Sequence, residues 1–347
     1  MKPPKADAPL HDRPPVPGQS LESVVGVRAD LRERLTSLPP GHPSSPWDEH
    51  GAPRPPVSRL SETERLEPKL SDADYAAHVA DVSRSLEAAR AAGLTTDKLH
   101  AVGPHRDIWP DDRAEIHHEI LETVYQASAA VPCERRALIA GGLGGAGKTT
   151  LLDRHPGLDR SEFLTINPDS FKEELAERGM VPTVPGLSPM EASTLAHEES
   201  SYLAWQLARR AIAEGKNIIW DITMSSVAST TCRIDELKAN GYQNIEGIFV
   251  DIPVETSVAR MGERHRRGHD MFLSGQGMGG RYVPAEVIRA QADPEYGSVN
   301  RRIFETLKGQ FDSWTRYDNS ISGRVPIIVE QNGPSRPRSM DGTESDD

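Results

Sequence analysis

Residues 137–152 read ALIAGGLGGAGKTTLL, and this stretch decides the fold. The apolar run Ala137–Ala140 predicts a short buried strand, and Thr149 onward predicts the start of a helix. Between them, residues 142–149 match the pattern G-x-x-x-x-G-K-[ST] at every fixed position. A strand, a glycine loop and a helix in this order are typical of a phosphate-binding loop.

The residue types in this loop suit a nucleoside triphosphate. Glycines let successive backbone N–H groups turn inward around phosphate oxygens, which a Cβ would obstruct. Lys148 offers a positive charge to the β- and γ-phosphates, and the Thr149 hydroxyl can hold Mg²⁺. The helix start adds further N–H donors and a partial positive charge. We therefore predict a binding site for ATP or GTP with Mg²⁺, formed by Gly142, Gly144, Gly145, Ala146, Gly147, Lys148, Thr149 and Thr150.

Composition narrows the class of protein. The chain has 347 residues and a net charge of −12, from 52 acidic and 40 basic residues, which argues against a nucleic-acid partner. Two cysteines, Cys133 and Cys232, are too few for a disulfide framework and suit a reducing compartment. The sequence contains no apolar run of the ~20 residues that a membrane span needs. We expect a cytoplasmic protein with no membrane partner.

Amino-acid composition and hydrophobic spacing divide the chain into four parts. Residues 1–60 are rich in proline and are expected to be a disordered tail, with one short helix near Leu21–Leu38. Residues 61–110 are expected to be a helical extension, 111–332 a nucleotide-binding domain, and 333–347 a disordered C-terminal tail. Two helices are predicted before the loop, at Ser71–Ala92 and Asp111–Ala129. For the first of them, packing on the domain and a regulatory role both remain open.

From Val131 onward, strand patterns alternate with helical ones, which predicts a three-layer α/β domain with a mostly parallel sheet. The nucleotide should then lie beyond the carboxyl ends of the strands. The predicted strands are Ala137–Ala140, Phe163–Asn167, Asn217–Asp221, Ile245–Asp251 and Pro326–Glu330. The predicted helices are Thr149–Arg154, Asp169–Glu177, Pro189–Glu214, Ala228–Asn240, Pro253–Arg267, Pro284–Gln291 and Gly297–Trp314.

Two aspartates stand at predicted strand ends. Asp169 follows the second strand and faces the place of an acceptor hydroxyl, whose proton it could accept; it could instead cap the helix that starts there. Asp221 ends the third strand. Its carboxylate could coordinate Mg²⁺, accept a hydrogen bond from the substrate, or cap the following turn. The sequence leaves these alternatives open.

Arginines surround a glycine-rich segment after the fourth strand. The segment runs from Gly268 to Gly280, and such a segment flanked by arginines suits a lid over the nucleotide. The planar guanidinium matches phosphate oxygens and stabilises charge on a moving phosphoryl group. We expect Arg264 and Arg281 to bind phosphate, and Arg281 to act in catalysis. The other arginines, Arg260, Arg266 and Arg267, are expected to be exposed or supporting.

A series of motifs, in this order after the phosphate loop, resembles the zeta toxins, which are P-loop kinases of toxin–antitoxin systems. The motifs are Asn167-Pro-Asp169-Ser-Phe171-Lys172, His197-Glu-Glu-Ser200, Asp221-Ile-Thr223, Arg264 and Gly-Gly-Arg281-Tyr-Val-Pro. The resemblance covers about residues 111–330 and is far more specific than the phosphate loop alone. It implies a P-loop kinase fold.

The resemblance also implies an activity, which is phosphorylation of a UDP-N-acetyl amino sugar, UDP-N-acetylglucosamine above all, on its 3′-hydroxyl. ATP or GTP would be the donor, and a small helical antitoxin would be the protein partner. It implies that Lys148 and Thr149 serve the nucleotide and Mg²⁺, and that Asp169 is the base. Asp221 and Thr223 would contact the sugar nucleotide, while Arg264 and Arg281 would clamp the phosphates.

The chain departs from the family pattern in two places that concern the acceptor. Asp221 stands where the family often has Glu, and the helix before that strand offers no clean equivalent of a further sugar-contacting carboxylate. Glu198 or Glu199 could take that place, and we expect Glu199 to bind substrate. Two alternatives therefore stay open: a P-loop kinase for another small-molecule hydroxyl, and a nucleotide-gated binding protein.

Overall fold

The computed structural model of the protein describes residues 70–103, 106–155 and 158–332. The expected disordered tails, residues 1–60 and 333–347, and the expected helix at Leu21–Leu38 lie outside the described residues. Within them, every helix is either too short or too polar to cross a lipid bilayer.

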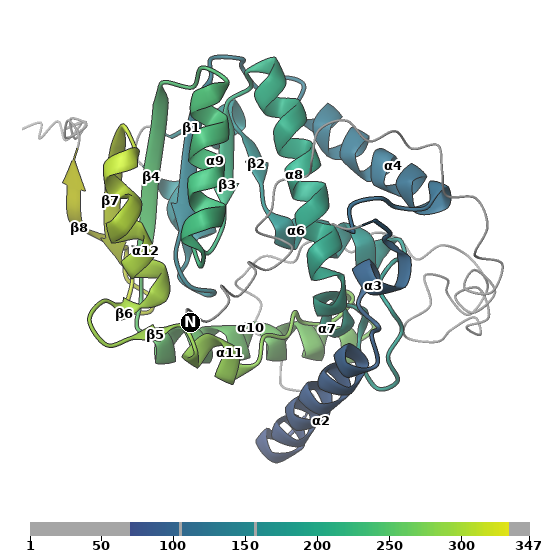
Figure 1. The fold of residues 1–347 in the computed structure, drawn as a ribbon. Coiled ribbons are helices and arrows are strands. Elements are labelled where there is room, and N and C mark those ends of the chain that lie inside the picture. The colour runs from purple at the N-terminus through teal and green to yellow at the C-terminus, as the bar shows by residue number, and fades with distance from the viewer. Residues whose placement is uncertain (1–69, 104–105, 156–157, 333–347) are drawn as a thin grey trace, which may run out of the picture.

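A six-stranded sheet in the order β2-β3-β1-β4-β7-β8 forms the centre of the molecule (Figure 1). Its strands are β1 (Arg136–Gly141), β2 (Leu164–Ile166), β3 (Ile218–Asp221), β4 (Asn244–Asp251), β7 (Ser313–Asp318) and β8 (Ile327–Asn332). All neighbouring pairs are parallel except β7 and β8. The register places Ala140 beside Asp221 on one side and Ile248 on the other, so the carboxyl ends of these strands share one edge. The predicted, mostly parallel sheet is confirmed.

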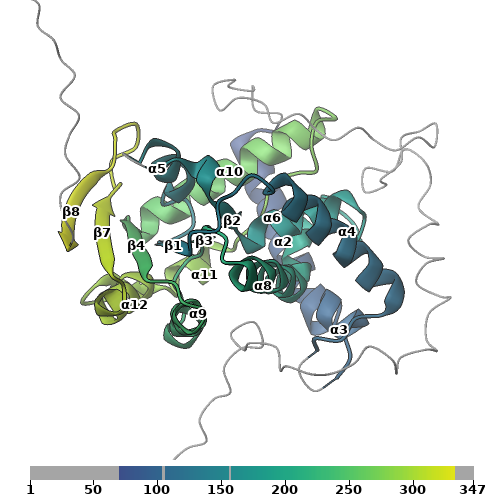
Figure 2. The same cartoon turned by 90° about the horizontal axis from the view of Figure 1, so that it is seen from above.

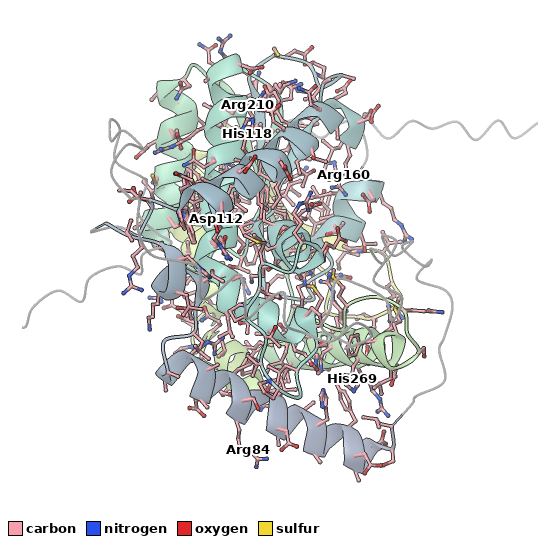
Figure 3. All side chains as sticks on the ribbon, turned by 90° about the vertical axis from the view of Figure 1, so that its right-hand side faces the viewer. Arg84, Asp112, His118, Arg160, Arg210 and His269 are labelled. Carbon is pink, nitrogen blue, oxygen red and sulfur yellow. The ribbon has the colours of Figure 1, made fainter. Side chains whose placement is uncertain are left out.

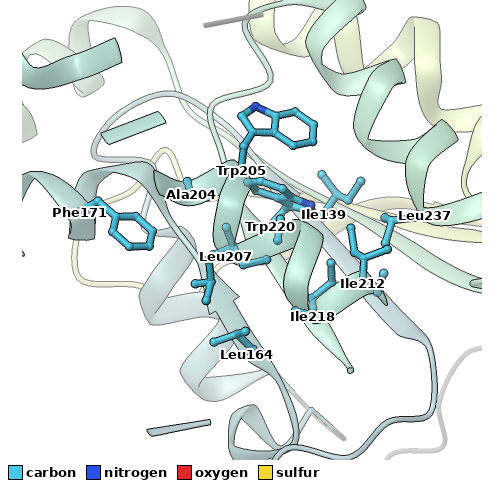
Figure 4. Close-up of a cluster of buried hydrophobic side chains, with 14 of the residues drawn as sticks. Ile139, Leu164, Phe171, Ala204, Trp205, Leu207, Ile212, Ile218, Trp220 and Leu237 are labelled. Carbon is cyan, nitrogen blue, oxygen red and sulfur yellow. The ribbon is translucent and has the colours of Figure 1, made fainter. Parts of the chain in front are cut away.

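Alternating residues of the strands build two hydrophobic layers. On one face Ile139, Trp220 and Phe249 belong to the cluster that includes α8 (His197–Glu214), α9 (Val227–Ala239) and α12 (Val299–Leu307). Figure 4 shows part of this layer, with Trp205 of α8 above Trp220. On the other face Leu138 packs against α5 (Lys148–Arg154). Figure 2 shows α5 and these three helices on opposite sides of the sheet. The period of two along each strand thus produces the three layers.

The helices before the phosphate loop pack on this domain. They are α2 (Asp72–Ala91), α3 (Thr96–His100) and α4 (Asp111–Ala127). Arg210 of α8, labelled in Figure 3, pairs with Glu122 of α4. In α2, Val82 and Leu86 are buried in a cluster with Leu187, Leu195 and Tyr282. The structure thus shows α2 packed on the domain, and a regulatory role of this helix stays a prediction.

In the C-terminal part of the chain, the predicted helix Gly297–Trp314 is wrong in its second half. The helix α12 ends at Leu307, a 3₁₀ turn covers Lys308–Gln310, and Ser313–Asp318 forms the parallel strand β7. The predicted strand Pro326–Glu330 exists as β8, but it is an antiparallel edge strand. A short hairpin of β5 (Ala292–Asp293) and β6 (Gly297–Ser298) was not expected either.

Two other predictions change near the site. The single helix Pro189–Glu214 is divided into α7 (Pro189–Ala192), a 3₁₀ helix at Ser193–Ala196, and α8. The helix α10 (Val254–Leu273) passes through Gly268 and ends six residues beyond the predicted Arg267. A Cβ on Gly268 would lie 2.5 Å from the Cα of Gly280, so this glycine permits a close crossing of two backbones. The part of the glycine-rich segment that lies outside α10 is thus shorter than expected, and its end at Gly280 is packed on α10.

The remaining α-helices agree with the predicted pattern. These are α6 (Pro168–Glu177) and α11 (Ala285–Arg289), whereas a 3₁₀ turn at Arg160–Glu162 was not predicted. Asn167 caps α6 by accepting a hydrogen bond from the Asp169 backbone N–H at 2.9 Å, and Pro168 takes the first helical position, where its missing N–H costs nothing.

Candidate active site

The phosphate loop leaves β1 at the central edge of the sheet and enters α5. Gly142 and Gly147 have φ values of 138° and 86°, which favour glycine. A Cβ on Gly142 would lie 2.3 Å from the carbonyl oxygen of Val250, so no larger residue fits there. The glycine pattern of the sequence thus reflects both the turn and the contact with β4.

Side chains outside the loop hold its carbonyl groups in place. Ser257 Oγ donates to the Gly144 carbonyl at 2.6 Å, Arg260 to that of Gly145 at 3.2 Å, and Asn319 Nδ2 to that of Ala146 at 2.7 Å. A planar trans peptide directs C=O and N–H in opposite directions. The N–H groups of Gly145 and Gly147, which follow two of these carbonyls, therefore turn to the inner side of the loop, where a phosphate would bind, while the Ala146 N–H donates to the Leu143 carbonyl at 3.1 Å.

Lys148, Asp221 and Asn167 form a polar group beside the loop. Lys148 Nζ donates to the Gly142 carbonyl at 3.2 Å and lies 3.7 Å from Asp221 Oδ1. Asn167 Nδ2 donates to Asp221 Oδ2 at 3.1 Å. The Asp221 side chain is only 8% exposed, so these partners offset the cost of burying its charge. The ends of β2 and β3 thus meet the phosphate loop.

Asp169 is held by two cations rather than by a capping bond. Its carboxylate lies 3.0 Å from Lys172 Nζ and 2.9 Å from Arg281 Nη1. Because Asn167 provides the cap of α6, the alternative in which Asp169 is the N-cap is wrong. Desolvation acts to raise the pKa of Asp169, but Lys172 and Arg281 outweigh it and hold the pKa well below its usual range. The carboxylate is therefore ionised at neutral pH.

Arg264 and Arg281 approach the same place from α10 and from the segment behind it. Desolvation, and then repulsion by Arg281, lower the pKa of the Arg264 guanidinium, while Asp169 and Asp221 act in the opposite direction. Two guanidinium groups that repel one another at one site suit an anion such as a phosphate chain. The structure thus brings together Lys148, Asp169, Asp221 and both expected arginines.

The predicted hydroxyl ligands are open to this space. Thr149, Thr150 and Thr223 are exposed. The Thr223 hydroxyl donates to Ser225 Oγ at 3.2 Å, while its carbonyl accepts from Asn300 Nδ2 at 2.8 Å, which fixes the turn after β3. The Thr149 hydroxyl and the Asp221 carboxylate are oxygen donors of the kind that Mg²⁺ prefers, so the residues present fit this ion.

The structure corrects the expected role of Glu199 in substrate binding. Its side chain is fully buried, with Oε1 at 2.5 Å from Arg113 Nε and 2.6 Å from His117 Nε2, and Oε2 at 2.7 Å from Arg113 Nη2. Both oxygens are thus occupied by α4. The expected contact of Glu199 with substrate does not fit this arrangement, and the residue instead joins α8 to α4.

The side chains that order the loop were missed from the sequence. Arg260 was expected to be exposed or supporting and supports the loop, but Ser257 and Asn319 carried no motif. Ser257, Arg260 and Arg264 follow one another at helical spacing along α10, a pattern that could have indicated a common face toward the loop. Asn319 follows an unrecognised strand, so its sequence position offered no signal.

Comparison with known proteins agrees with this geometry. Residues 130–301 match the family model described as Zeta toxin. The sequence matches no curated protein at a significant level.

The chain is similar to several solved structures, and the first two described here share its fold. AvrRxo1-ORF1:AvrRxo1-ORF2 with sulphate ions has a TM-score of 0.53 and 18% identity over 68% of this chain and 76% of that chain. AvrRxo1-ORF1:-ORF2 with ATP has a TM-score of 0.52 and 19% identity over the same shares. A structure of the PezAT toxin–antitoxin system of Streptococcus pneumoniae has a TM-score of 0.47 and 17% identity, over 65% of this chain and 83% of that chain. The parallel sheet, the phosphate loop and the family match converge: the chain contains a Zeta toxin family domain with a kinase-like fold.

Proposed function

We propose that the chain is a small-molecule kinase that transfers the γ-phosphoryl group of ATP to a hydroxyl group. The observation that carries this proposal is the ionised Asp169 carboxylate, held between Lys172 and Arg281 at the strand edge where the phosphate loop lies. Phosphoryl transfer needs donors that cradle the phosphates, cations that follow the moving charge, and an acceptor for the hydroxyl proton. This edge offers all three.

Each residue has a role in this proposal. The inward N–H groups of the loop and Lys148 bind the β- and γ-phosphates, and Thr149 and Asp221 would hold Mg²⁺, which neutralises charge on the phosphates. Asp169 orients the acceptor hydroxyl and accepts its proton as the bond to phosphorus forms. Arg281 and Arg264 stabilise the transferred group, and Thr223 contacts the acceptor. Because Arg281 pairs with Asp169 in the structure, we propose that the γ-phosphate draws Arg281 away and frees the carboxylate.

For the acceptor, we propose a UDP-N-acetyl amino sugar, with UDP-N-acetylglucosamine favoured by the motif series. Since Glu199 is occupied by Arg113 and His117, the sugar must be recognised without it. Another small molecule with a reactive hydroxyl is the second candidate, because the loop, Asp169 and the arginines would serve any small hydroxyl acceptor in the same way.

Phosphorus NMR of the purified protein with ATP, Mg²⁺ and a panel of acceptors tests this proposal. The panel contains UDP-N-acetylglucosamine, UDP-glucose, a nicotinamide dinucleotide and a sample without acceptor. We expect a new phosphomonoester signal with the UDP-N-acetyl sugar alone. A signal with another acceptor would replace the substrate and keep the kinase, whereas ATP conversion to inorganic phosphate in every sample would contradict transfer.

A helical antitoxin is the proposed protein partner, since the Zeta toxin family belongs to toxin–antitoxin systems. Expression in a bacterial host tests the need for one. We expect growth arrest with the full chain and normal growth with Lys148→Ala at equal protein level. Equal growth of both cultures, with active enzyme recovered from the first, would argue against a toxin that needs restraint.

A further inference from the structure

A buried cluster of one glutamate and three histidines joins α2, α7 and α10, apart from the phosphate loop. Glu191 Oε1 lies 2.7 Å from His78 Nε2, 2.9 Å from His265 Nε2 and 3.5 Å from His269 Nδ1. Glu191 is fully buried, and His265 and His269 are 2% and 5% exposed. Figure 3 labels His269, a residue of α10, on the side of that helix that faces α2. Neither the motif series nor the proposed kinase chemistry uses these residues.

The glutamate is fixed so that only one oxygen faces the histidines. Glu191 Oε2 accepts from the Ser188 N–H at 2.7 Å and from Ser188 Oγ at 2.9 Å, as part of a capping box at α7. Oε1 remains for three imidazole nitrogens. The nearly buried His269 Nδ1 makes no hydrogen bond within the described residues. A buried polar atom of this kind needs a partner, because burying it unpaired costs free energy.

We propose that His78, Glu191 and His269 bind a divalent transition-metal ion of the Zn²⁺ class. Their ligand atoms all lie within 4.8 Å of one another. Ligand atoms around a tetrahedral Zn²⁺ with bonds of about 2.0–2.1 Å are separated by about 3.3 Å, which is close to the separations of Oε1 from the imidazoles. Two neutral imidazoles and one carboxylate form a usual ligand set for such an ion, and the ion neutralises the buried carboxylate.

His265 has a supporting position in this site. It lies on α10, one turn before His269, so both histidines are on one face of this helix. Its Nε2 donates to Glu191 Oε1, and its Nδ1 lies 2.7 Å from the Tyr75 hydroxyl of α2. A partner of this kind orients a ligating carboxylate and raises its affinity for metal. His265 is therefore a positioning residue.

The metal would fasten the N-terminal helix α2 to α10, the helix that carries Arg264 and packs against Gly280. A Cβ on Gly280 would lie 2.2 Å from the His265 carbonyl oxygen, so Arg281 follows directly after a backbone contact with the cluster. Occupancy by metal would thereby order α10, which presents Arg264, and the segment behind it, which presents Arg281. The metal site is independent of the kinase proposal, because it rests on other residues.

Metal binding by the full chain, without a histidine tag, tests the proposal. Protein stripped with a chelator is titrated with Zn²⁺ against a chromogenic competitor, in excess Mg²⁺ to fill sites made of oxygen ligands. We expect one high-affinity Zn²⁺ per chain, which His78→Gln and His269→Gln each abolish. His265→Gln should weaken binding by about 10–100-fold, as loss of an outer partner does. His118→Gln, an exposed position on α4, is the matched control and should bind as the wild type does.

Two further measurements distinguish loss of a metal ligand from failure of a variant to fold. Co²⁺ in place of Zn²⁺ should give visible absorption bands of tetrahedral cobalt in wild type and control but not in His78→Gln, whose partly exposed side chain is the mildest loss. Wild-type protein should melt at a higher temperature with Zn²⁺ than after chelation. Absence of a stoichiometric site in the wild type, or equal affinity in His78→Gln and the control, would overturn the metal site and leave a hydrogen-bonded cluster.

Discussion

At the scale of single residues, the candidate site depends on charges that hold one another in place. Lys148 reaches back to the Gly142 carbonyl while staying 3.7 Å from Asp221, and Asp169 stays between Lys172 and Arg281. Such pairs keep charged groups oriented before a ligand arrives, which lowers the cost of reorganisation during a reaction. Single substitutions at these residues can therefore separate the effect on ATP binding from the effect on phosphoryl transfer.

Lys148→Ala removes the cation that serves the β- and γ-phosphates and leaves the apolar core untouched. We expect a folded protein in which transfer falls by at least about 10³-fold, on the order of 4 kcal/mol of transition-state stabilisation. Circular dichroism checks the fold, and a coupled ADP assay measures the rate. Unchanged turnover at saturating ATP would remove Lys148 from the mechanism.

Arg281→Lys keeps the positive charge but loses the planar fork. We expect the catalytic rate to fall by roughly 10–10³-fold, with a much smaller change in ATP affinity, because the fork acts mainly on the moving phosphoryl group. The rate and the Kd for ATP are measured on the same preparation. Arg267→Lys, on the exposed side of α10, is the control. Equal rates for Arg281→Lys and wild type would place Arg281 outside the reaction.

The sequence predicted residues whose role depends on a local pattern. Lys148 and Thr149 follow from the glycine loop, and Asp169 from its place after a strand. It could not predict Asn319, because that residue reaches Ala146 only through the tertiary fold. Nor could it decide whether Glu199 meets substrate or Arg113, since the two partners lie 86 residues apart in the chain.

At the scale of elements, close approach of backbones explains where the prediction was wrong. Gly268 suggested a flexible lid, yet it lies within α10 and permits contact with Gly280. Near the C-terminus, Ile303, Leu307, Phe311 and Trp314 continue a helical spacing because all four pack into the same cluster. That spacing concealed the end of α12 and the start of β7, which tertiary pairing with β4 decides.

Gly268→Ala tests the close crossing. Its Cβ would push the segment with Gly280 and Arg281 away from α10, so we expect a loss of about 1–3 kcal/mol in stability and a lower transfer rate. Gly262→Ala is the matched control on the same helix, where a Cβ has nothing within 4 Å. It should stabilise the protein by about 0.5–1 kcal/mol, as alanine does in a helix interior. Urea unfolding measures the free energy of unfolding of both variants. Equal stability of the two would contradict the close packing of Gly268 on Gly280.

At the scale of the whole molecule, buried ion pairs fasten the N-terminal helices to the kinase-like domain. Burial acts to raise the pKa of Glu199, but the nearby Arg113 and hydrogen bonds from His117 and Arg113 outweigh it and lower the pKa from 4.5 to about 2. A carboxyl whose pKa is lower in the folded state adds stability above its unfolded pKa. That stability is lost as pH falls from about 4.5 toward about 2.

Glu199→Gln would leave Arg113 as an uncompensated buried charge. We expect a loss of about 3–5 kcal/mol in the free energy of unfolding at pH 7. The difference from wild type should shrink as pH falls from about 4.5 toward about 2, because the carboxyl of the unfolded wild-type chain takes up a proton in this range while that of the folded chain stays ionised. Denaturant unfolding at several pH values measures this, with the exposed Glu119→Gln as control. A difference that stays constant down to pH 3 would contradict the pairing.

The central claim, that Asp169 serves phosphoryl transfer at this loop, is tested most directly by the single-turnover rate of Asp169→Asn. Asparagine keeps the shape of the side chain but cannot accept the hydroxyl proton, and the cap of α6 remains because Asn167 provides it. With the acceptor found by NMR, we predict transfer slower by about 10²–10⁴-fold, with a folded protein by circular dichroism and an unchanged ATP affinity. Transfer at the wild-type rate would contradict the account.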